Sequence, residues 1–204
     1  MTPAEIESLF TRTDGSFLCA RWGRPIVPVV FGVDDATLAV VKGAMEAVVA
    51  HAGHSMAETD PELGANLMVF FFRDWDELPK VPKLEQMIPG LGDLCIRLRA
   101  AEATTYRTFR YDPAGTIRAA FVFLRMDAQL GALPAEDIAL AQAAQVMLSW
   151  GEGAFAARSP LARDGDRVVL HPAIAGLIRA GYDPVLPAVS TDPTHALRLA
   201  ARLV

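Results

Sequence analysis

The sequence predicts an α+β fold in which a mixed sheet packs on a buried central helix, followed by a C-terminal helical tail. Apolar, β-branched runs and one helical pattern alternate in the first half of the chain, a hairpin turn lies near residue 114, and helical patterns dominate from residue 134 onward. Strands followed by helices are typical of α+β domains. The length of 204 residues fits one domain, with residues 21–150 as a sheet-and-helix core and 151–204 as a C-terminal loop and helices.

Two apolar runs in the first half predict strands. Residues 24–32 read RPIVPVVFG, and Pro28 indicates an edge position or a bulge because proline donates no hydrogen bond. Residues 66–73 read NLMVFFFR, which is typical of a central strand that is buried on both faces. Between them, an acidic N-cap at Asp34 and an apolar stripe at helical spacing predict a helix that ends at Gly53.

The middle of the chain predicts one further sheet unit. Residues 78–92 contain three prolines and predict a surface excursion with at most one short helix, near 84–87. Residues 94–99 alternate weakly between apolar and polar, and we count them with the strands. Residues 106–111 and 116–125 flank an Asp-Pro-Ala-Gly turn, which predicts a hairpin.

The last third predicts helices. Residues 134–150 are apolar almost all round and contain neither glycine nor proline after the first position, which predicts a buried helix. Residues 151–166 are loop-like. A short helix is expected from His171 to Gly181, and a last one from the cap at Thr191 to about Arg202.

Composition and charge exclude several classes of protein. A hydrophobic content of 52% and a mean hydropathy of +0.26 exclude a disordered chain. The net charge of −5 argues against a nucleic-acid partner, and no apolar run approaches the roughly 18–20 residues of a transmembrane segment. The N-terminal residues do not read as a signal peptide, so the sequence as it stands predicts a cytoplasmic protein. A leader removed upstream would instead make it periplasmic or envelope-associated.

The cysteines and histidines of the sequence give little support for metal binding or thiol chemistry. Cys19 and Cys95 form no Cys-x-x-Cys pair, and we expect two buried, unpaired thiols, with a single disulfide as the alternative. His51 and His54 are three residues apart, but the predicted helix ends at Gly53 between them. A solvated helix end is therefore favoured over a metal site.

Two glutamines on the predicted 134–150 helix are candidate ligand-binding residues. Gln142 and Gln145 are three apart and share a face with Ile138 and Ser149. A buried amide without a partner costs about 1–3 kcal/mol, so both side chains must either hydrogen-bond inward or face a cavity. Hydrogen bonds to neighbouring groups are the commoner solution.

The order of elements resembles the zincin architecture, in which a helix beneath the sheet carries His-Glu-x-x-His. There the two histidines bind zinc and the glutamate activates water. The corresponding residues here are 141–145, AQAAQ, which offer neither a histidine nor a carboxylate. The resemblance therefore implies a degenerate, non-catalytic domain without a metal or other cofactor.

The chain is also similar to a bacterial family of unknown function, several members of which resemble lipoproteins. The likeness runs from Arg21 to Ala201 and rests on Ala144–Ser149 with the following Gly-Glu, on Leu177–Pro184, and on Arg21-Trp22 and Asn66 before the two strands. The sequence departs from the family pattern by having Ala141 and Gln142 where acidic residues are expected.

Three functions follow from these observations. The first is a non-catalytic zincin-like domain that binds an unknown protein or small molecule in a vestigial cleft, through Gln142, Gln145, Glu152 and Trp75. Trp75 follows a buried strand and is able either to stack on a ligand or to cap the core. The second is a hydrolase that uses a carboxylate among Glu152, Asp164 and Asp166. The third is a structural envelope or oligomerisation module. The ligand and the oligomeric state are not predicted.

Overall fold

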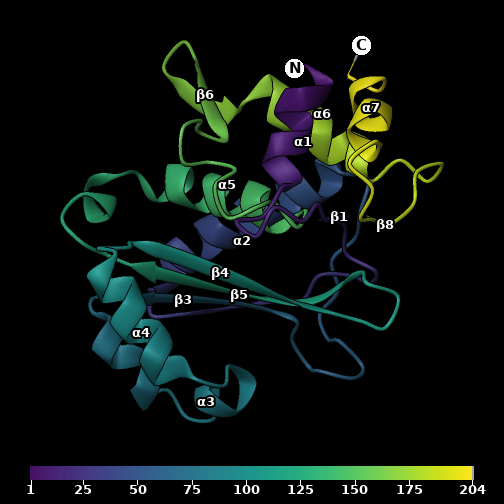
Figure 1. The fold of residues 1–204 in the computed structure, drawn as a ribbon. Coiled ribbons are helices and arrows are strands. Elements are labelled where there is room, and N and C mark those ends of the chain that lie inside the picture. Colours follow the sequence, from purple (N-terminus) through teal and green to yellow (C-terminus); the bar gives the residue numbers. More distant parts are fainter. Residues whose placement is uncertain (204) are drawn as a thin grey trace.

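A four-stranded mixed sheet separates two layers of helices in the computed structural model, which describes residues 1–203 (Figure 1). Its strand order is β2-β3-β5-β4, with β2 parallel to β3, β3 parallel to β5, and β4 antiparallel to β5. The strands are β2 (Pro28–Phe31), β3 (Leu67–Phe72), β4 (Thr105–Tyr111) and β5 (Ile117–Arg125). The α+β class and the mixed sheet are thus confirmed, with Pro28 on an edge strand and β3 in the interior of the sheet.

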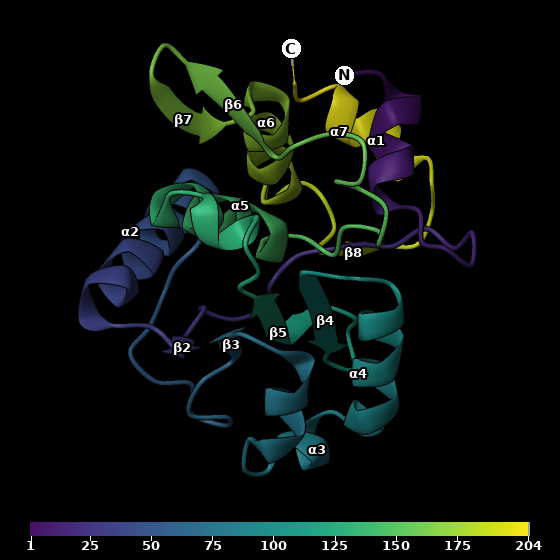
Figure 2. The same ribbon diagram turned by 90° about the vertical axis from the view of Figure 1, so that its left-hand side faces the viewer.

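One face of the sheet is covered by the larger helical layer. Helices α2 (Asp35–His51) and α5 (Ala135–Val146) lie directly on it, and α1 (Pro3–Phe10), α6 (Pro172–Gly181) and α7 (His195–Ala200) lie beyond them (Figures 1 and 2). The apolar core on this side draws on residues from Ile6 to Leu199. Helix α5 is buried within it, as its apolar composition predicts, although it ends four residues before Trp150.

The other face is covered by a segment for which the sequence prediction was wrong. The 3-10 helix η1 (Trp75–Lys80), α3 (Leu84–Met87) and α4 (Leu91–Ala100) build a second core there. The short helix expected near 84–87 is present as α3, but residues 78–92 are more than a surface excursion, and residues 94–99 form a helix rather than a strand. The physical reason is the spacing of Leu91, Leu94 and Leu98, which places all three on one helical face against the sheet.

The two ends of the chain lie side by side (Figures 1 and 2). Helix α1 packs on α7, and β1 (Cys19–Ala20) pairs with β8 (Val189–Ser190). Residues 151–166 are also more ordered than expected, because β6 (Leu161–Asp164) forms a hairpin with β7 (Arg167–Leu170). The helical tail is present, but α7 begins at His195 rather than just after Thr191.

The two cysteines lie in different cores. Cys19 belongs to the core under α5, Cys95 to the core under α4, and both are free and buried. Within the described residues, no helix is both long and apolar enough to cross a membrane.

A buried carboxylate ties the loop before β3 to the start of β2. Asp60 is 4% exposed and accepts hydrogen bonds from the backbone N–H groups of Glu62 and Leu63 (both 2.9 Å), the amide of Asn66 (3.0 Å) and the guanidinium of Arg24 (3.3 Å). Burial by itself raises the pKa of Asp60, but these donors outweigh it and lower the pKa to about 2. The ionised form is therefore favoured by folding.

We expect Asp60→Ala to lower the free energy of unfolding by about 1–3 kcal/mol at pH 7, because the donors lose their acceptor. The carboxylate stabilises the fold fully above its unfolded pKa of about 3.9, and this contribution is lost as the pH falls toward 2. Urea denaturation at several pH values should show the difference between wild type and variant narrowing below about pH 4. Glu58 is exposed, so the control Glu58→Ala should change the free energy of unfolding by less than about 0.5 kcal/mol. A difference that widens on acidification would contradict this assignment.

Candidate functional site

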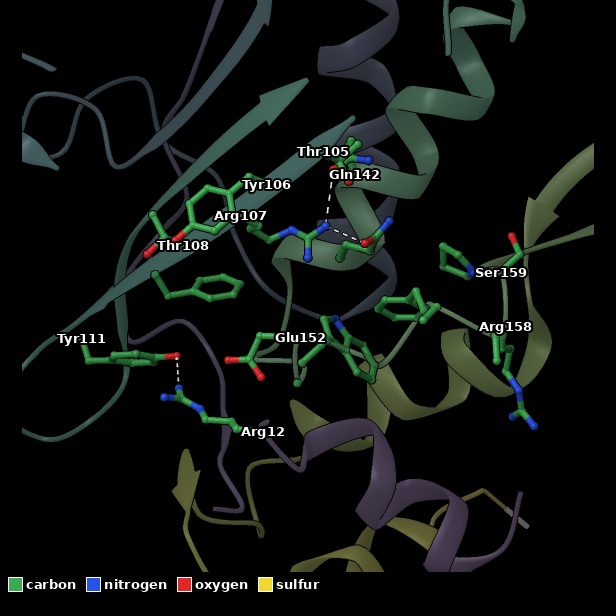
Figure 3. A pocket seen from close by; sticks show the side chains of 18 residues that line it. Arg12, Thr105, Tyr106, Arg107, Thr108, Tyr111, Gln142, Glu152, Arg158 and Ser159 are labelled. Atoms are coloured by element: carbon green, nitrogen blue, oxygen red, sulfur yellow. Dashed lines mark hydrogen bonds between the residues drawn. The ribbon is translucent and has the colours of Figure 1, made fainter. Parts of the chain in front are cut away.

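A pocket of about 870 Å³ lies between β4, the C-terminal part of α5 and the segment that follows α5 (Figure 3). This volume is within the range of small-molecule sites. Its lining comes from three separate parts of the chain: Arg12, residues 105–109 with Tyr111, and Gln142, Gln145, residues 150–152 and residues 155–160.

The structure brings three of the four proposed ligand-binding residues to this pocket. Gln145 lines it from α5. Gln142 reaches it from the same helix and Glu152 from the segment after α5 (Figure 3). Trp75 lies on the opposite face of the sheet, where it is 1% exposed and its indole Nε1 donates to the carbonyl of Ala103 at 3.0 Å. It serves the second core there and does not line the pocket.

Arg107 is the partner of both glutamines. It points from β4 toward α5, and its Nη2 donates to Oε1 of Gln145 at 2.5 Å and, at the outer limit of 3.5 Å, to Oε1 of Gln142 (Figure 3). Gln142 is 8% exposed. The two amides are therefore held by a side chain from the sheet rather than by neighbouring backbone.

The positive charge of Arg107 has no anionic partner within residues 1–203. No carboxylate of the described chain lies within 4 Å of its guanidinium, and its Nε is buried without a hydrogen-bond partner. Burial lowers the pKa of Arg107 to about 10, which leaves the side chain cationic at neutral pH. Its compensation comes from neutral amide oxygens in the last turn of α5, where the negative end of the helix dipole also favours a cation.

The other charged groups of the pocket are engaged with the N-terminal segment. Glu152 accepts a hydrogen bond from the backbone N–H of Thr13 at 3.0 Å. Arg12 donates to the hydroxyl of Tyr111 at 3.0 Å and lies over its ring. Arg158 forms an ion pair with a glutamate of α1 and points away from the pocket (Figure 3). Arg107 is therefore the cation that the pocket wall presents without a charged or aromatic partner.

The carboxylates of the hydrolase hypothesis are not gathered in this pocket. Asp164 and Asp166 are exposed around the β6–β7 turn and do not contribute to the lining, so Glu152 is its one carboxylate within residues 1–203. The lining described here also contains no histidine and no cysteine.

The histidines near the end of α2 make structural contacts. Nε2 of His51 lies 2.9 Å from the carbonyl of Ala175, and Nε2 of His54 lies 2.9 Å from the carbonyl of Arg24. Among residues 1–203, no three His, Cys, Asp or Glu side chains are grouped as a metal site requires.

Sequence reasoning missed Arg107, although it predicted the strand that carries it. The strand reads TYRTFRY, and alternation places Arg107 on the same face as Phe109 and Tyr111. A cation sharing a face with two aromatic residues was the signal, because such a face normally packs on the core. The two glutamines needed hydrogen-bond partners, so together with them this signal would have indicated that β4 and α5 form the pocket.

We expect Gln145→Leu to lower the free energy of unfolding by about 1–3 kcal/mol, because the partly buried guanidinium of Arg107 loses its nearest acceptor. Denaturant unfolding at pH 7 measures the change. Gln86→Leu is a matched control on an exposed position of α3 and should alter stability by less than about 0.5 kcal/mol. Wild-type stability in Gln145→Leu would show that the hydrogen bond to Arg107 contributes nothing.

Comparison with known proteins found no matching family model, no matching curated protein and no matching solved structure. The likeness to zincins and to the bacterial family therefore stays a prediction from the sequence.

Proposed function

We propose that this chain is a non-catalytic binding domain and that its pocket between β4 and α5 binds an anionic ligand. The observation that carries the proposal is the guanidinium of Arg107, which lines the pocket and has no carboxylate within 4 Å in residues 1–203. A ligand carboxylate or phosphate would supply the missing negative charge.

The pocket offers such a ligand both charge and contact surface. Nη1 of Arg107 makes no hydrogen bond to the described residues and is available to an anion, while Nη2 is held in place by Gln145. Charge-assisted hydrogen bonds of this kind are about twice as strong as neutral ones. Trp150 and Phe155 line the pocket as well, so a ligand with an acidic group and an apolar body fits best.

The composition of the lining supports binding rather than catalysis. A general acid or base must reach the reacting atoms, and a nucleophile is commonly activated by a neighbouring base, whereas Glu152, the one carboxylate of the described lining, is engaged by the backbone N–H of Thr13. On the zincin-like interpretation, Gln145 occupies the second metal-ligand position. Its amide then holds a guanidinium where a metal ligand would stand, which agrees with a vestigial cleft.

Isothermal titration calorimetry with glutarate and with inorganic phosphate tests this function. We expect wild type to bind at least one of the two anions and Arg107→Gln to bind it at least tenfold more weakly. Gln145→Glu should have the same effect, because the new carboxylate would pair with the guanidinium and cancel the attraction for a ligand.

The matched control is Arg97→Gln, which removes an exposed arginine from α4 on the other side of the sheet and should leave binding unchanged. Absence of binding to wild type, or equal binding by Arg107→Gln, would overturn the proposed function.

A further inference from the structure

The pocket runs along an open edge of the sheet. Strand β4 ends the order β2-β3-β5-β4 and pairs on one side with β5 alone (Figure 2). The N–H of Arg125 donates to the carbonyl of Thr104 at 2.7 Å, so residue 104 and every second residue after it face β5. The backbone groups of Thr105, Arg107 and Phe109 therefore point away from β5, toward the open edge.

These three residues are also pocket residues. Within residues 1–203, no backbone hydrogen bond joins Thr105, Arg107 or Phe109 to any segment on the open side. The carbonyl of Phe109 accepts one bond, from the side chain of Arg110. An edge with free N–H and C=O groups is a template for another strand, and here it forms one wall of a pocket.

The charge of β4 selects the kind of strand that fits. The strand contains two arginines and no acidic residue. Arg107 faces α5, while Arg110 lies on the other face, where it donates to Oγ1 of Thr108 and to the carbonyl of Met87. Neither arginine has a carboxylate within 4 Å among the described residues.

A second copy of this chain is a poor occupant for that reason. Two β4 strands paired about a two-fold axis would bring arginines of both copies together, and like charges on neighbouring strands are destabilising. An acidic strand has the complementary charge. Its side chain opposite Arg107 would have its Cβ about 4.5–5.5 Å from that of Arg107, within reach of the guanidinium.

We propose that the ligand of this pocket is an extended acidic peptide, which adds to β4 as a fifth, antiparallel strand and places a carboxylate on Arg107. This inference rests on the proposed function and names its ligand class. The outward N–H and C=O groups of Thr105, Arg107 and Phe109 bind the peptide backbone, and Arg107 selects an acidic side chain on the face toward α5. The side chains two positions away on the same face meet the part of the pocket lined by Trp150 and Phe155.

The test uses the full chain and a family of capped pentapeptides in isothermal titration calorimetry. The parent is acetyl-Val-Thr-Glu-Thr-Val-amide, in which the two valines share a face with the glutamate, and its counterpart carries Gln in place of Glu. We expect the parent to bind at least tenfold more tightly than glutarate, and the Gln peptide to bind at least tenfold more weakly than the parent. Arg107→Gln should remove the preference for Glu over Gln, whereas Arg97→Gln should retain it.

A pair of N-methylated peptides tests the strand geometry. In antiparallel pairing the residue opposite Arg107 exchanges both backbone hydrogen bonds with it, whereas the N–H of the next residue points away. Methylation of the glutamate nitrogen should therefore weaken binding at least tenfold, and methylation of the following threonine nitrogen should change it less than threefold. Equal affinity of the two methylated peptides would overturn strand addition.

The failures of the two proposals are distinguishable. Binding of glutarate that depends on Arg107, with the parent peptide no tighter than glutarate, would leave the anion site standing and overturn the peptide ligand. Failure of glutarate, phosphate and the parent peptide to bind wild type would overturn both proposals.

Discussion

The guanidinium of Arg107 must be hydrogen-bonded where it enters the space between the sheet and helix α5, and this requirement determines how β4 and α5 meet at the pocket. Most of the surface of α5 is made of alanine and aliphatic side chains packed in the core. Beyond the acidic first turn with Glu136 and Asp137, its polar residues are two glutamines, and both meet the same cation from β4. A hydrogen bond to a charged group contributes about 1.5–3 kcal/mol net, which is enough to fix the last turn of α5 against this strand.

Amide acceptors affect the charge of the pocket wall differently from carboxylates. Gln145 satisfies N–H donors of Arg107 without neutralising its charge, so the pocket wall stays positive. At 4 Å and an effective dielectric constant of 20, an opposite unit charge is worth about 4 kcal/mol of attraction. A glutamate in place of Gln145 would form an ion pair with Arg107, and the attraction would then no longer be available to a ligand. On the proposed function, the glutamine leaves that attraction to a ligand and also holds the guanidinium in place for it.

The sequence predicted much of the frame because the relevant signals are local. The continuous apolar run of β3, the Asp-Pro-Ala-Gly turn between β4 and β5, and the composition of α5 each report on one element. Sequence reasoning also recognised that Gln142 and Gln145 required partners or a cavity. It did not use the alternation that places Arg107 on one face with Phe109 and Tyr111. That alternation reports on the strand alone, because the hydrogen bond from Arg107 to Gln145, 38 residues later in the chain, leaves no periodic signal of its own. Prolines likewise concealed the second core, since the three of them suggested a loop where the leucines of α4 pack on the sheet.

The far wall of the pocket depends on a close contact that no local pattern encodes. Immediately after Trp150, which stacks on Phe10 with ring centroids 4.9 Å apart, the N–H of Gly151 donates to the carbonyl of Leu9 at 2.9 Å. A Cβ at position 151 would lie 2.2 Å from the carbonyl oxygen of Thr11, so glycine is required for the chain to pass this close. The passage holds the segment after α5 against the end of α1, and residues of this segment line the pocket together with residues of β4. The shape of the pocket therefore depends on a contact between the N-terminal residues and the chain after α5, as well as on the hydrogen bonds between Arg107 and α5.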